Sequence, residues 1–287
     1  MMALGNVLTA MVTPFDSKGN IDFQRIPKLI NYLINNGTDG IIVGGTTGES
    51  ATLSIEEKAT LYEQSAKASA GRIPVYAGTG MNDTYATAEL TVRAEKLGVD
   101  GIMLVAPYYN KPSQRGMYEH FKTIAEKTTL PVMLYNVPGR TVVNLLPETV
   151  IALSKIPNIT SVKEASGNLD QVTTIIANTP DDFAVYSGDD SLTLPALAVG
   201  ADGVVSVSSH IIGNEMQEMV KSFKEGDINK AAMIHQRLLP TMRTMFIAPS
   251  PAPVKTALQL KGMDVGGVRL PLIPLTSEER QMISDIL

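Results

Sequence analysis

One short pattern occurs three times in the chain, as Asn36-Gly-Thr-Asp-Gly40, Leu97-Gly-Val-Asp-Gly101 and Val199-Gly-Ala-Asp-Gly203. In each copy a helical pattern ends, a turn follows at the first glycine, and a short apolar run begins at the second. A chain that passes repeatedly from helix to strand through a short turn is typical of βα units. The three copies therefore predict an α/β fold.

Eight short apolar runs follow one another along the chain. Their starts lie 20 to 34 residues apart, which leaves room for one helix and two loops in each interval. Several runs lack polar alternation, as expected for parallel strands that are covered on both faces. The predicted strands are Val7–Pro14, Gly40–Gly45, Pro74–Gly78, Gly101–Ala106, Pro131–Tyr135, Ile159–Lys163, Phe183–Ser187 and Gly203–Val207.

The intervals between these runs contain helical patterns. Apolar residues recur at helical spacing in Phe23–Asn36, and Ser54-Ile-Glu-Glu57 has the form of a capping box that opens a helix. The other predicted helices are Thr84–Leu97, Met117–Lys127, Pro147–Leu153, Leu169–Asn178, Leu192–Val199 and Glu215–Lys224.

Eight βα units predict a closed (β/α)8 TIM barrel over residues 1–224. The alternative is a doubly wound sheet, which usually has a glycine-rich fingerprint after its first strand, and Val7–Phe15 contains none. Residues 225–287 hold three further helical patterns separated by proline-rich connectors. We expect them to form a small C-terminal helical segment with no catalytic pattern of its own.

Composition excludes several classes of protein. The chain has 287 residues, of which 44% are hydrophobic and 18% charged, and this balance excludes intrinsic disorder. It has no cysteine, so disulfides and thiolate chemistry are excluded. The net charge of −5 and the absence of a basic run predict no nucleic-acid partner. With no secretory leader at Met1–Asn6 and no apolar stretch of roughly 18 residues, we predict a cytoplasmic protein without membrane contact.

A glycine-rich segment, Gly44-Gly-Thr-Thr-Gly-Glu-Ser50, follows the second predicted strand. In a barrel, chemistry is expected where strands end and βα loops begin. Backbone N–H groups of such a turn can face one anion, with the hydroxyls of Thr46 and Thr47 beside them. A plain glycine-rich turn remains the alternative. No lysine follows the last glycine, which excludes a nucleotide P-loop.

Lys163 ends the sixth predicted strand. Ile159, Ser161 and Lys163 share one face by period-2 alternation. An amine at the mouth of a barrel is a candidate nucleophile for a carbonyl carbon. The alternative is a lysine that extends from the strand end into water.

Further polar side chains follow the fourth and fifth strands. Tyr135 places a phenol at the same rim as Lys163 and can transfer protons, and Arg140 offers a bidentate fork for a carboxylate. Tyr108 and Tyr109 follow the fourth strand, where ordinary packing with the hydroxyl in water is the alternative.

The remaining candidates are weaker. Asp189 and Asp190 are expected to cap a helix, and His120, His210 and His235 lack the spacing of a metal site. Dinucleotide and serine-hydrolase motifs are also missing.

The candidates that remain are an amine, a phenol, hydroxyls, an anion cradle and an arginine. Together they suit Schiff-base chemistry on an α-keto acid.

Four motifs give the chain a family resemblance. They are Gly45-Thr-Thr-Gly-Glu-Ser50, Tyr108-Tyr-Asn-Lys-Pro-Ser113, Tyr135-Asn-Val-Pro-Gly-Arg-Thr141 and Val162-Lys-Glu-Ala-Ser-Gly-Asn168. Together they resemble the dihydrodipicolinate synthase family, within the pyruvate-dependent class I aldolase superfamily that includes N-acetylneuraminate lyase. The likeness covers essentially the whole chain. Arg140 is its discriminating feature, since sugar-acid lyases of the superfamily differ there.

The resemblance implies a homo-oligomeric lyase of lysine and diaminopimelate biosynthesis. Such an enzyme condenses pyruvate with L-aspartate 4-semialdehyde to give 4-hydroxy-tetrahydrodipicolinate. No cofactor is expected, because the intermediate is a covalent Schiff base between Lys163 and pyruvate. Two alternatives stay open: a sister lyase acting on a sugar acid, and a barrel that binds a keto acid without turnover. Whether the oligomer is a dimer or a tetramer is left open.

The resemblance also implies catalytic roles. Lys163 would form the Schiff base and Tyr135 would transfer protons. Thr47 and Tyr109 would complete the proton relay, with Tyr109 reaching into the site of a neighbouring subunit.

Four further residues are implied to bind substrate. Thr46, together with Thr47, would hold the carboxylate of pyruvate, and Arg140 would hold the carboxylate of the aldehyde. The backbone at Gly188 and Val205 would line the pyruvate pocket.

The resemblance extends to the site where lysine-inhibited relatives bind L-lysine. Positions that match that site are Ser50, Ala51, Asn82 and Tyr108. Two positions differ, because Lys58 stands in place of a histidine and Ala86 in place of a glutamate. Without the glutamate, the ammonium of bound lysine loses its negatively charged partner. Lys58 also adds a positive charge nearby, which repels that ammonium. We therefore predict weak or absent inhibition by lysine.

Overall fold

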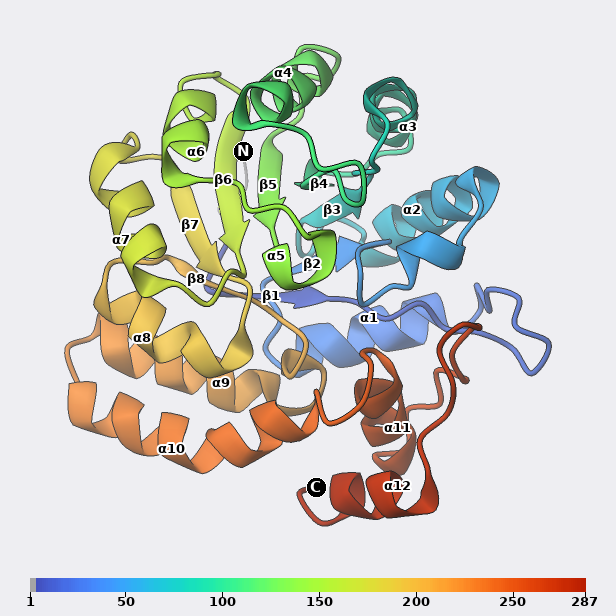
Figure 1. Cartoon of the computed structure of the whole chain (residues 1–287). Coiled ribbons are helices and arrows are strands. Elements are labelled where there is room, and N and C mark those ends of the chain that lie inside the picture. Colours follow the sequence, from blue (N-terminus) through green and yellow to red (C-terminus); the bar gives the residue numbers. More distant parts are fainter. Residues whose placement is uncertain (1–3) are drawn as a thin grey trace.

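A closed barrel of eight parallel strands forms the centre of the molecule, and its strands are paired in chain order (Figure 1). The computed structural model describes residues 4–287, so residues 1–3 of the stretch predicted to carry no leader lie outside it. The predicted TIM barrel is confirmed. The strands are β1 (Val7–Ala10), β2 (Gly40–Val43), β3 (Val75–Gly78), β4 (Gly101–Val105), β5 (Val132–Asn136), β6 (Ile159–Glu164), β7 (Ala184–Ser187) and β8 (Gly203–Ser206).

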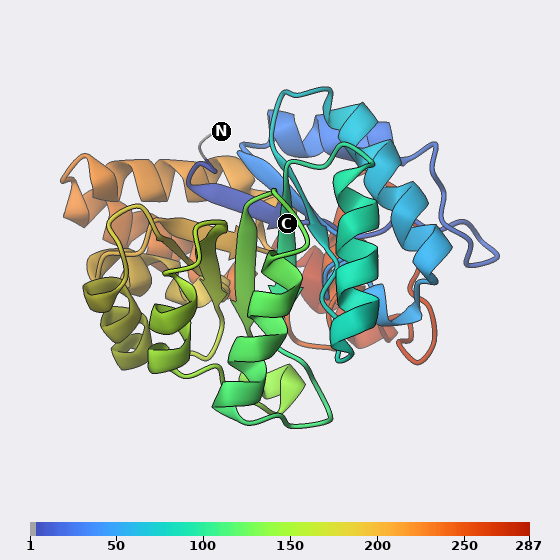
Figure 2. The ribbon, with the colours of Figure 1, turned by 90° about the horizontal axis from the view of Figure 1, so that it is seen from above.

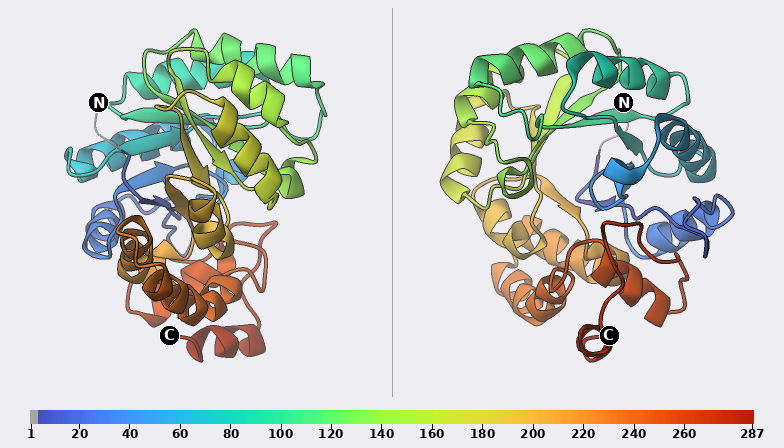
Figure 3. Two further views of the ribbon diagram at one scale, coloured as in Figure 1. Left: turned by 90° about the vertical axis from the view of Figure 1, so that its left-hand side faces the viewer. Right: turned by 45° about the vertical axis from the view of Figure 1, so that its right-hand side comes forward.

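Helices surround the strands on all sides, as Figures 2 and 3 show. Every predicted helix of the barrel is present. The barrel helices are α1 (Ile26–Asn35), α2 (Ile55–Ser69), α3 (Thr84–Glu95), α4 (Gln114–Ala125), α5 (Pro138–Thr141), α6 (Pro147–Leu153), α7 (Leu169–Asn178), α8 (Thr193–Ala198) and α9 (Ser209–Lys224), with short 3-10 turns at Ser50–Thr52 and Asp190–Leu192.

Two features of the helices differ from the prediction. The single turn α5 was not predicted, because four residues are too few to show a helical period. Helix α9 begins at Ser209, six residues before the predicted start at Glu215, and non-helical backbone at Ile212 marks a kink in its first turns. The kink interrupts the regular apolar spacing from which the start was predicted.

Each copy of the repeated Gly-x-Asp-Gly pattern joins the strand that follows it to the strand that precedes it. In all three copies the aspartate N–H donates to a backbone carbonyl near the start of the preceding strand, and the aspartate carboxylate accepts the N–H of that same residue. The pairs are Asp39 with Val7, Asp100 with Val75 and Asp202 with Val185, with carboxylate distances of 3.0, 2.9 and 2.7 Å. The glycine that follows lets a neighbour approach closely, since a Cβ at Gly101 would lie 2.3 Å from the ring of Tyr76.

Two apolar clusters stabilise the barrel. One lies between the strands and the helices, and the other fills the interior. The interior cluster comprises Leu8, Ala10, Ile42, Tyr76, Met103, Met133, Tyr135, Val137, Tyr186 and Val205. Alternation along β5 places Met133 and Tyr135 on the inner face, paired in register with Ser161 and Lys163 of β6. The barrel thus directs the phenol and the amine to the same interior.

Three helices follow the barrel: α10 (Ile228–Thr244), α11 (Ala252–Leu260) and α12 (Ser277–Ser284). Helix α10 packs on α9, and α12 packs on α11 (Figure 1, orange and red). The boundary predicted at residues 224 and 225 stays a prediction. Between residues 4 and 287, no helix combines the length and apolar character needed to cross a membrane.

Candidate active site

A cavity of about 580 Å³ opens where the strands end, and we call it the Lys163 cavity. Six of the eight residues predicted to act or bind there line it, namely Thr46, Thr47, Tyr135, Arg140, Lys163 and Gly188. The C-terminal segment, which was expected to carry no catalytic pattern, also contributes to the wall through Met242, Arg243, Phe246 and Ser250. The site is therefore built from strands and from the segment that follows the barrel.

Lys163 is buried, with 5% of its surface exposed, and its Nζ lies 4.4 Å from the centroid of the Tyr135 ring. The two residues are register partners on β6 and β5. None of the ion pairs formed within residues 4–287 includes Lys163. An amine that is buried, unpaired and open to a cavity is suited to attack a carbonyl carbon.

Gly188 leaves room for the side chain of Lys163. A Cβ at this position would lie 3.1 Å from both Cγ and Cε of Lys163, and 2.6 Å from the Cβ of Ala165. Contacts that close would displace the lysine. The absence of a side chain at Gly188 therefore sets the path of the amine into the cavity.

A buried polar network behind Lys163 fixes the pairing of β5 and β6. The Oε2 atom of Glu164 accepts hydrogen bonds from Asn136 Nδ2 and from Gln171 Nε2, each at 2.9 Å. Its Oε1 atom accepts the N–H of Ser166 at 2.6 Å. Because Asn136 and Glu164 directly follow Tyr135 and Lys163, the network holds those two residues in register.

Sequence reasoning missed this network, although the sequence contains a signal for it. Asn136 and Glu164 fall on the outward face of their strands, where the barrel otherwise buries apolar side chains. Two polar residues at matching positions of neighbouring strands indicate a buried hydrogen-bonded pair.

The glycine-rich segment Gly44–Ser50, called the threonine loop below, forms a tight turn above β2. The N–H of Glu49 donates to the carbonyl of Thr46 at 3.0 Å. Gly44 has a φ of 66°, and a Cβ there would lie 2.8 Å from the Tyr62 ring, so the close approach requires glycine. Thr47 is buried with 5% exposure, and it shares the Lys163 cavity with Thr46. Both threonines therefore line the same cavity as the amine of Lys163.

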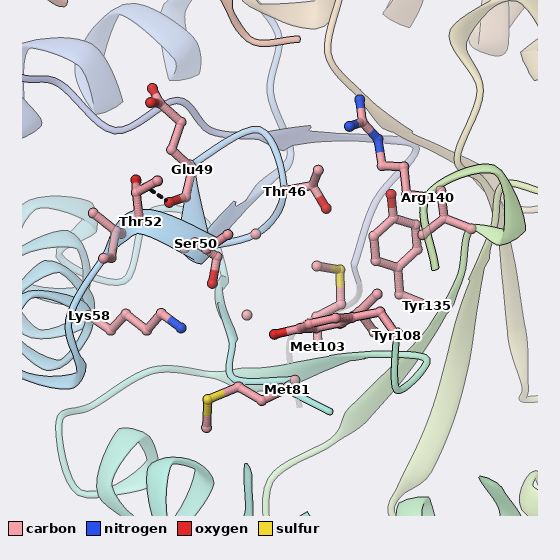
Figure 4. Close-up of a pocket in the computed structure, with 18 of the residues that line it drawn as sticks. Thr46, Glu49, Ser50, Thr52, Lys58, Met81, Met103, Tyr108, Tyr135 and Arg140 are labelled. Atoms are coloured by element: carbon pink, nitrogen blue, oxygen red, sulfur yellow. Dashed lines mark hydrogen bonds between the residues drawn. The ribbon is translucent and has the colours of Figure 1, made fainter. Parts of the chain in front are cut away.

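Arg140 lies on the one-turn helix α5 at the rim of the same cavity, where its side chain is exposed. Figure 4 shows Arg140 and Tyr135 together on one side of the opening. No ion pair within residues 4–287 uses its guanidinium. A free, planar guanidinium at a cavity rim can bind a carboxylate in bidentate fashion.

Two predicted site residues do not line the Lys163 cavity. Tyr109 is 86% exposed and has left-handed backbone with a φ of 75°, so its ring is open to solvent. Val205 is buried in the barrel interior, in the same apolar cluster as Tyr135. Their predicted roles, across a subunit interface and at the pyruvate pocket, stay predictions.

A second cavity of about 570 Å³ adjoins the first, and we call it the Lys58 cavity (Figure 4). Lys58 is 5% exposed, and burial lowers its pKa from the usual lysine value. The ammonium group of Lys58 and the hydroxyl of Tyr108 point towards each other across the opening (Figure 4). Of the predicted lysine-site positions, those that line it are Ser50, Ala51, Lys58 and Tyr108.

The other two predicted lysine-site positions lie nearby but do not line that cavity. The carbonyl of Asn82 accepts a hydrogen bond from Asn110 at 2.8 Å. Ala86 lies in the first turn of α3, which Asp83 caps by accepting the Ala86 N–H at 2.7 Å. The Asp83 carboxylate is thus already engaged at the start of that helix.

Asp189 caps a helical turn as predicted, whereas Asp190 lies within that turn and caps no helix of residues 4–287. His120 and His210 are buried, and His235 is half-buried. Asp189 caps the turn at residues 190–192 by accepting the N–H of Ser191. Asp190 accepts the N–H and the hydroxyl of Ser208, where α9 begins. Among residues 4–287 no group of three or more His, Cys, Asp or Glu side chains is arranged to hold a metal ion.

Comparison with known proteins gives consistent matches along the whole chain. The model of the dihydrodipicolinate synthetase family matches residues 3–287. The 4-hydroxy-tetrahydrodipicolinate synthase of Bacillus velezensis is 64% identical over 286 residues, which span 100% of this chain and 99% of the relative. A crystal structure of the dihydrodipicolinate synthase of Bacillus anthracis is 60% identical with a TM-score of 0.98, covering 100% of this chain and 98% of that one. The enzyme of Cyanidioschyzon merolae, solved with lysine bound, is 46% identical with a TM-score of 0.97, covering 99% and 97%.

Proposed function

The chain belongs to the dihydrodipicolinate synthetase family, and we propose that it condenses pyruvate with L-aspartate 4-semialdehyde to give 4-hydroxy-tetrahydrodipicolinate. This lyase reaction serves lysine and diaminopimelate biosynthesis and uses no external cofactor. The observation that carries the proposal is the buried, unpaired amine of Lys163 in a cavity beside the phenol of Tyr135.

In the first half-reaction, Lys163 forms a Schiff base with pyruvate. The amine nitrogen attacks the keto carbon and water leaves, so the nitrogen becomes part of a protonated imine. The imine withdraws electrons, and a methyl proton of pyruvate is lost to give an enamine. The hydroxyls of Thr46 and Thr47 hold the carboxylate, in keeping with their place in the same cavity.

Tyr135 transfers protons in these steps, because its ring lies against the Lys163 amine. Thr47 and Tyr109 complete the relay. Tyr109 comes from a second copy of the chain, a role supported by its exposure and by its absence from its own cavity. We therefore propose a homo-oligomer, a dimer or a tetramer, and we place it in the cytoplasm with other enzymes of amino-acid synthesis.

In the second half-reaction, the enamine attacks the aldehyde carbon of the semialdehyde, whose carboxylate is held by Arg140. The amine of the bound substrate then attacks the imine carbon. This step closes the ring and releases Lys163 as a free amine. One water molecule is lost overall, at the formation of the first imine.

Coupled turnover of pyruvate with L-aspartate 4-semialdehyde tests the proposal. We expect condensation by the wild type, none by Lys163→Met, and wild-type rates for Lys155→Met, which removes an exposed lysine after α6. Faster cleavage of a sugar acid such as N-acetylneuraminate would contradict the proposal and identify a sister lyase. Binding of pyruvate without turnover of either substrate would identify a keto-acid-binding barrel.

A further inference from the structure

We propose that the ion pair between Lys255 and Glu49 positions the threonine loop for pyruvate, so that the C-terminal segment determines how the first substrate binds. The inference rests on the proposed function, in which that loop holds the pyruvate carboxylate. Lys255 and Glu49 touch no substrate in this account. They act through the backbone of the loop and are positioning residues.

The Lys255–Glu49 pair is buried, and further hydrogen bonds hold both side chains in place. Lys255 Nζ lies 2.6 Å from Glu49 Oε1, with 2% and 1% of the two side chains exposed. The same ammonium donates to the carbonyl of Gly267 at 2.7 Å and lies 4.2 Å from the centroid of the Phe15 ring. The other oxygen of Glu49 accepts the N–H of Arg269 at 2.9 Å. Both carboxylate oxygens are thus held by the C-terminal segment.

The side chain of Arg269 binds the segment that directly follows the threonine loop. Its Nη1 atom donates to the carbonyl of Thr52 at 2.8 Å, and its Nε atom donates to the carbonyl of Gly19 at 2.7 Å. The guanidinium also pairs with Glu57 in the first turn of α2. Contacts from residues more than 200 positions away therefore fix both Glu49 and the turn after it.

The backbone of Glu49 transmits this restraint to the threonines. Glu49 has a φ of 58°, a left-handed conformation that is unfavourable for a residue with a side chain and persists only where its surroundings hold it. Its N–H closes the turn onto the carbonyl of Thr46 at 3.0 Å. Without its anchor, Glu49 can relax towards ordinary backbone angles, and this relaxation would shift Thr46 and Thr47.

Stability alone does not explain a buried pair at this place, because well-packed apolar side chains often serve a core equally well. Burial lowers the pKa of Lys255 to about 8, opposed by Glu49 and reinforced by Arg269. The charged groups that face it are those two, and its other neighbours are the carbonyl of Gly267 and the ring of Phe15. The Lys255 ammonium is charged at neutral pH and loses its proton as the pH rises through about 8.

The test measures steady-state kinetics of Glu49→Gln, Lys255→Met and the double variant. We expect the Michaelis constant for pyruvate to rise by about tenfold or more in each, since small displacements of binding groups have effects of that size. The constant for the semialdehyde, which Arg140 binds, should stay within about twofold. The double variant leaves no unpaired charge in the core, so it should unfold at a higher temperature than either single variant and still bind pyruvate weakly.

A matched control is Glu56→Gln, which breaks the exposed pair between Glu56 and Arg93 on neighbouring helices and should change neither constant. Wild-type affinity for pyruvate should also weaken above about pH 8, and the double variant should lack this change. If the single variants fail to fold, the Michaelis constant of the double variant for pyruvate provides the test.

The inference is overturned if the variants unfold at lower temperature and yield less active enzyme while their Michaelis constant for pyruvate stays at the wild-type value. That result would leave the pair with a purely structural role. Absence of condensation by the wild type in the same assay would instead contradict the proposed function. In that case, trapping of pyruvate by the wild type and the variants still measures the effect of the pair on the loop.

Discussion

Lys163 and Tyr135 are register partners on adjacent strands, and Nζ of Lys163 lies 4.4 Å from the ring centroid of Tyr135. Parallel pairing fixes this relationship, because partners in register direct their side chains to the same face of the sheet. The buried carboxylate of Glu164 then secures the two strands from the outer face. The fold thus holds the amine and the phenol together before any substrate binds.

Replacement of Tyr135 by phenylalanine removes the hydroxyl and keeps the ring against Lys163. We expect the turnover number to fall by about 10²- to 10⁴-fold, the usual contribution of a positioned proton donor. Thermal unfolding should be unchanged, because the tyrosine hydroxyls that form hydrogen bonds within residues 4–287 are those of Tyr62 and Tyr186, and Tyr135 is not among them. A turnover number within about threefold of wild type would contradict the relay.

Arg140→Ala tests recognition of the second substrate. Loss of a charge-assisted contact costs roughly 1.5–3 kcal/mol, or about ten- to over a hundredfold in kcat/KM for the semialdehyde. Formation of the pyruvate imine should continue at the wild-type rate. Arg243→Ala provides the control, since Arg243 lines the same cavity without an assigned role. Equal loss in both half-reactions would show that Arg140 does not act on the aldehyde alone.

Inhibition by L-lysine is expected to be weak or absent. The buried Lys58 places a positive charge in the cavity where lysine-inhibited relatives are expected to hold the ligand, and no carboxylate stands at Ala86. The missing charged partner alone is worth roughly 1.5–3 kcal/mol. Titration of L-lysine into the coupled assay measures this effect. Strong inhibition at sub-millimolar lysine would contradict it.

Two variants separate the effect of the missing carboxylate from that of the Lys58 charge on inhibition by lysine. Lys58→His combined with Ala86→Glu restores the residues of inhibited relatives and should create inhibition. Lys58→Met removes the repelling charge without adding a carboxylate, and should produce only a small gain. Equal inhibition of both variants would show that the carboxylate is not needed.

Protein stability should fall in mild acid because of His210. Its Nε2 accepts the N–H of Val12 at 3.2 Å, and its Nδ1 lies 2.8 Å from the carbonyl of Val207, which fits a neutral ring with the proton on Nδ1. Burial lowers the pKa of His210 to about 4. Above about pH 6.5 the ring is neutral in both states, whereas below that value only the unfolded chain gains the proton.

The free energy of unfolding should therefore decrease between about pH 6.5 and pH 4, by an amount on the order of 3 kcal/mol from this histidine. Urea denaturation at a series of pH values measures the slope. His210→Gln should reduce the slope whatever its effect on stability at neutral pH. An unchanged slope in this variant would contradict the assignment.

The sequence sufficed to predict the barrel because its signals are local. Strand runs, helix periods and the Gly-x-Asp-Gly turns each lie within a few residues, and all eight strands are present. Lys163, Tyr135 and the threonines could be placed together because the ends of parallel strands meet at one edge of a barrel.

Other features depend on contacts between distant residues. The pair of Lys255 with Glu49 spans 206 positions, and no local pattern marks it. The helix turn that carries Arg140 is too short to show a period. Tyr109 is exposed and does not line the Lys163 cavity of its own chain, so a single chain cannot complete the predicted relay.

Trapping of the Schiff base tests the central claim most directly. The protein is incubated with pyruvate and borohydride, digested, and analysed by mass spectrometry for a reduced adduct. We expect the adduct on Lys163 alone, its loss in Lys163→Met, and its persistence in Lys155→Met. The absence of an adduct on Lys163, or its formation on another lysine, would contradict the account.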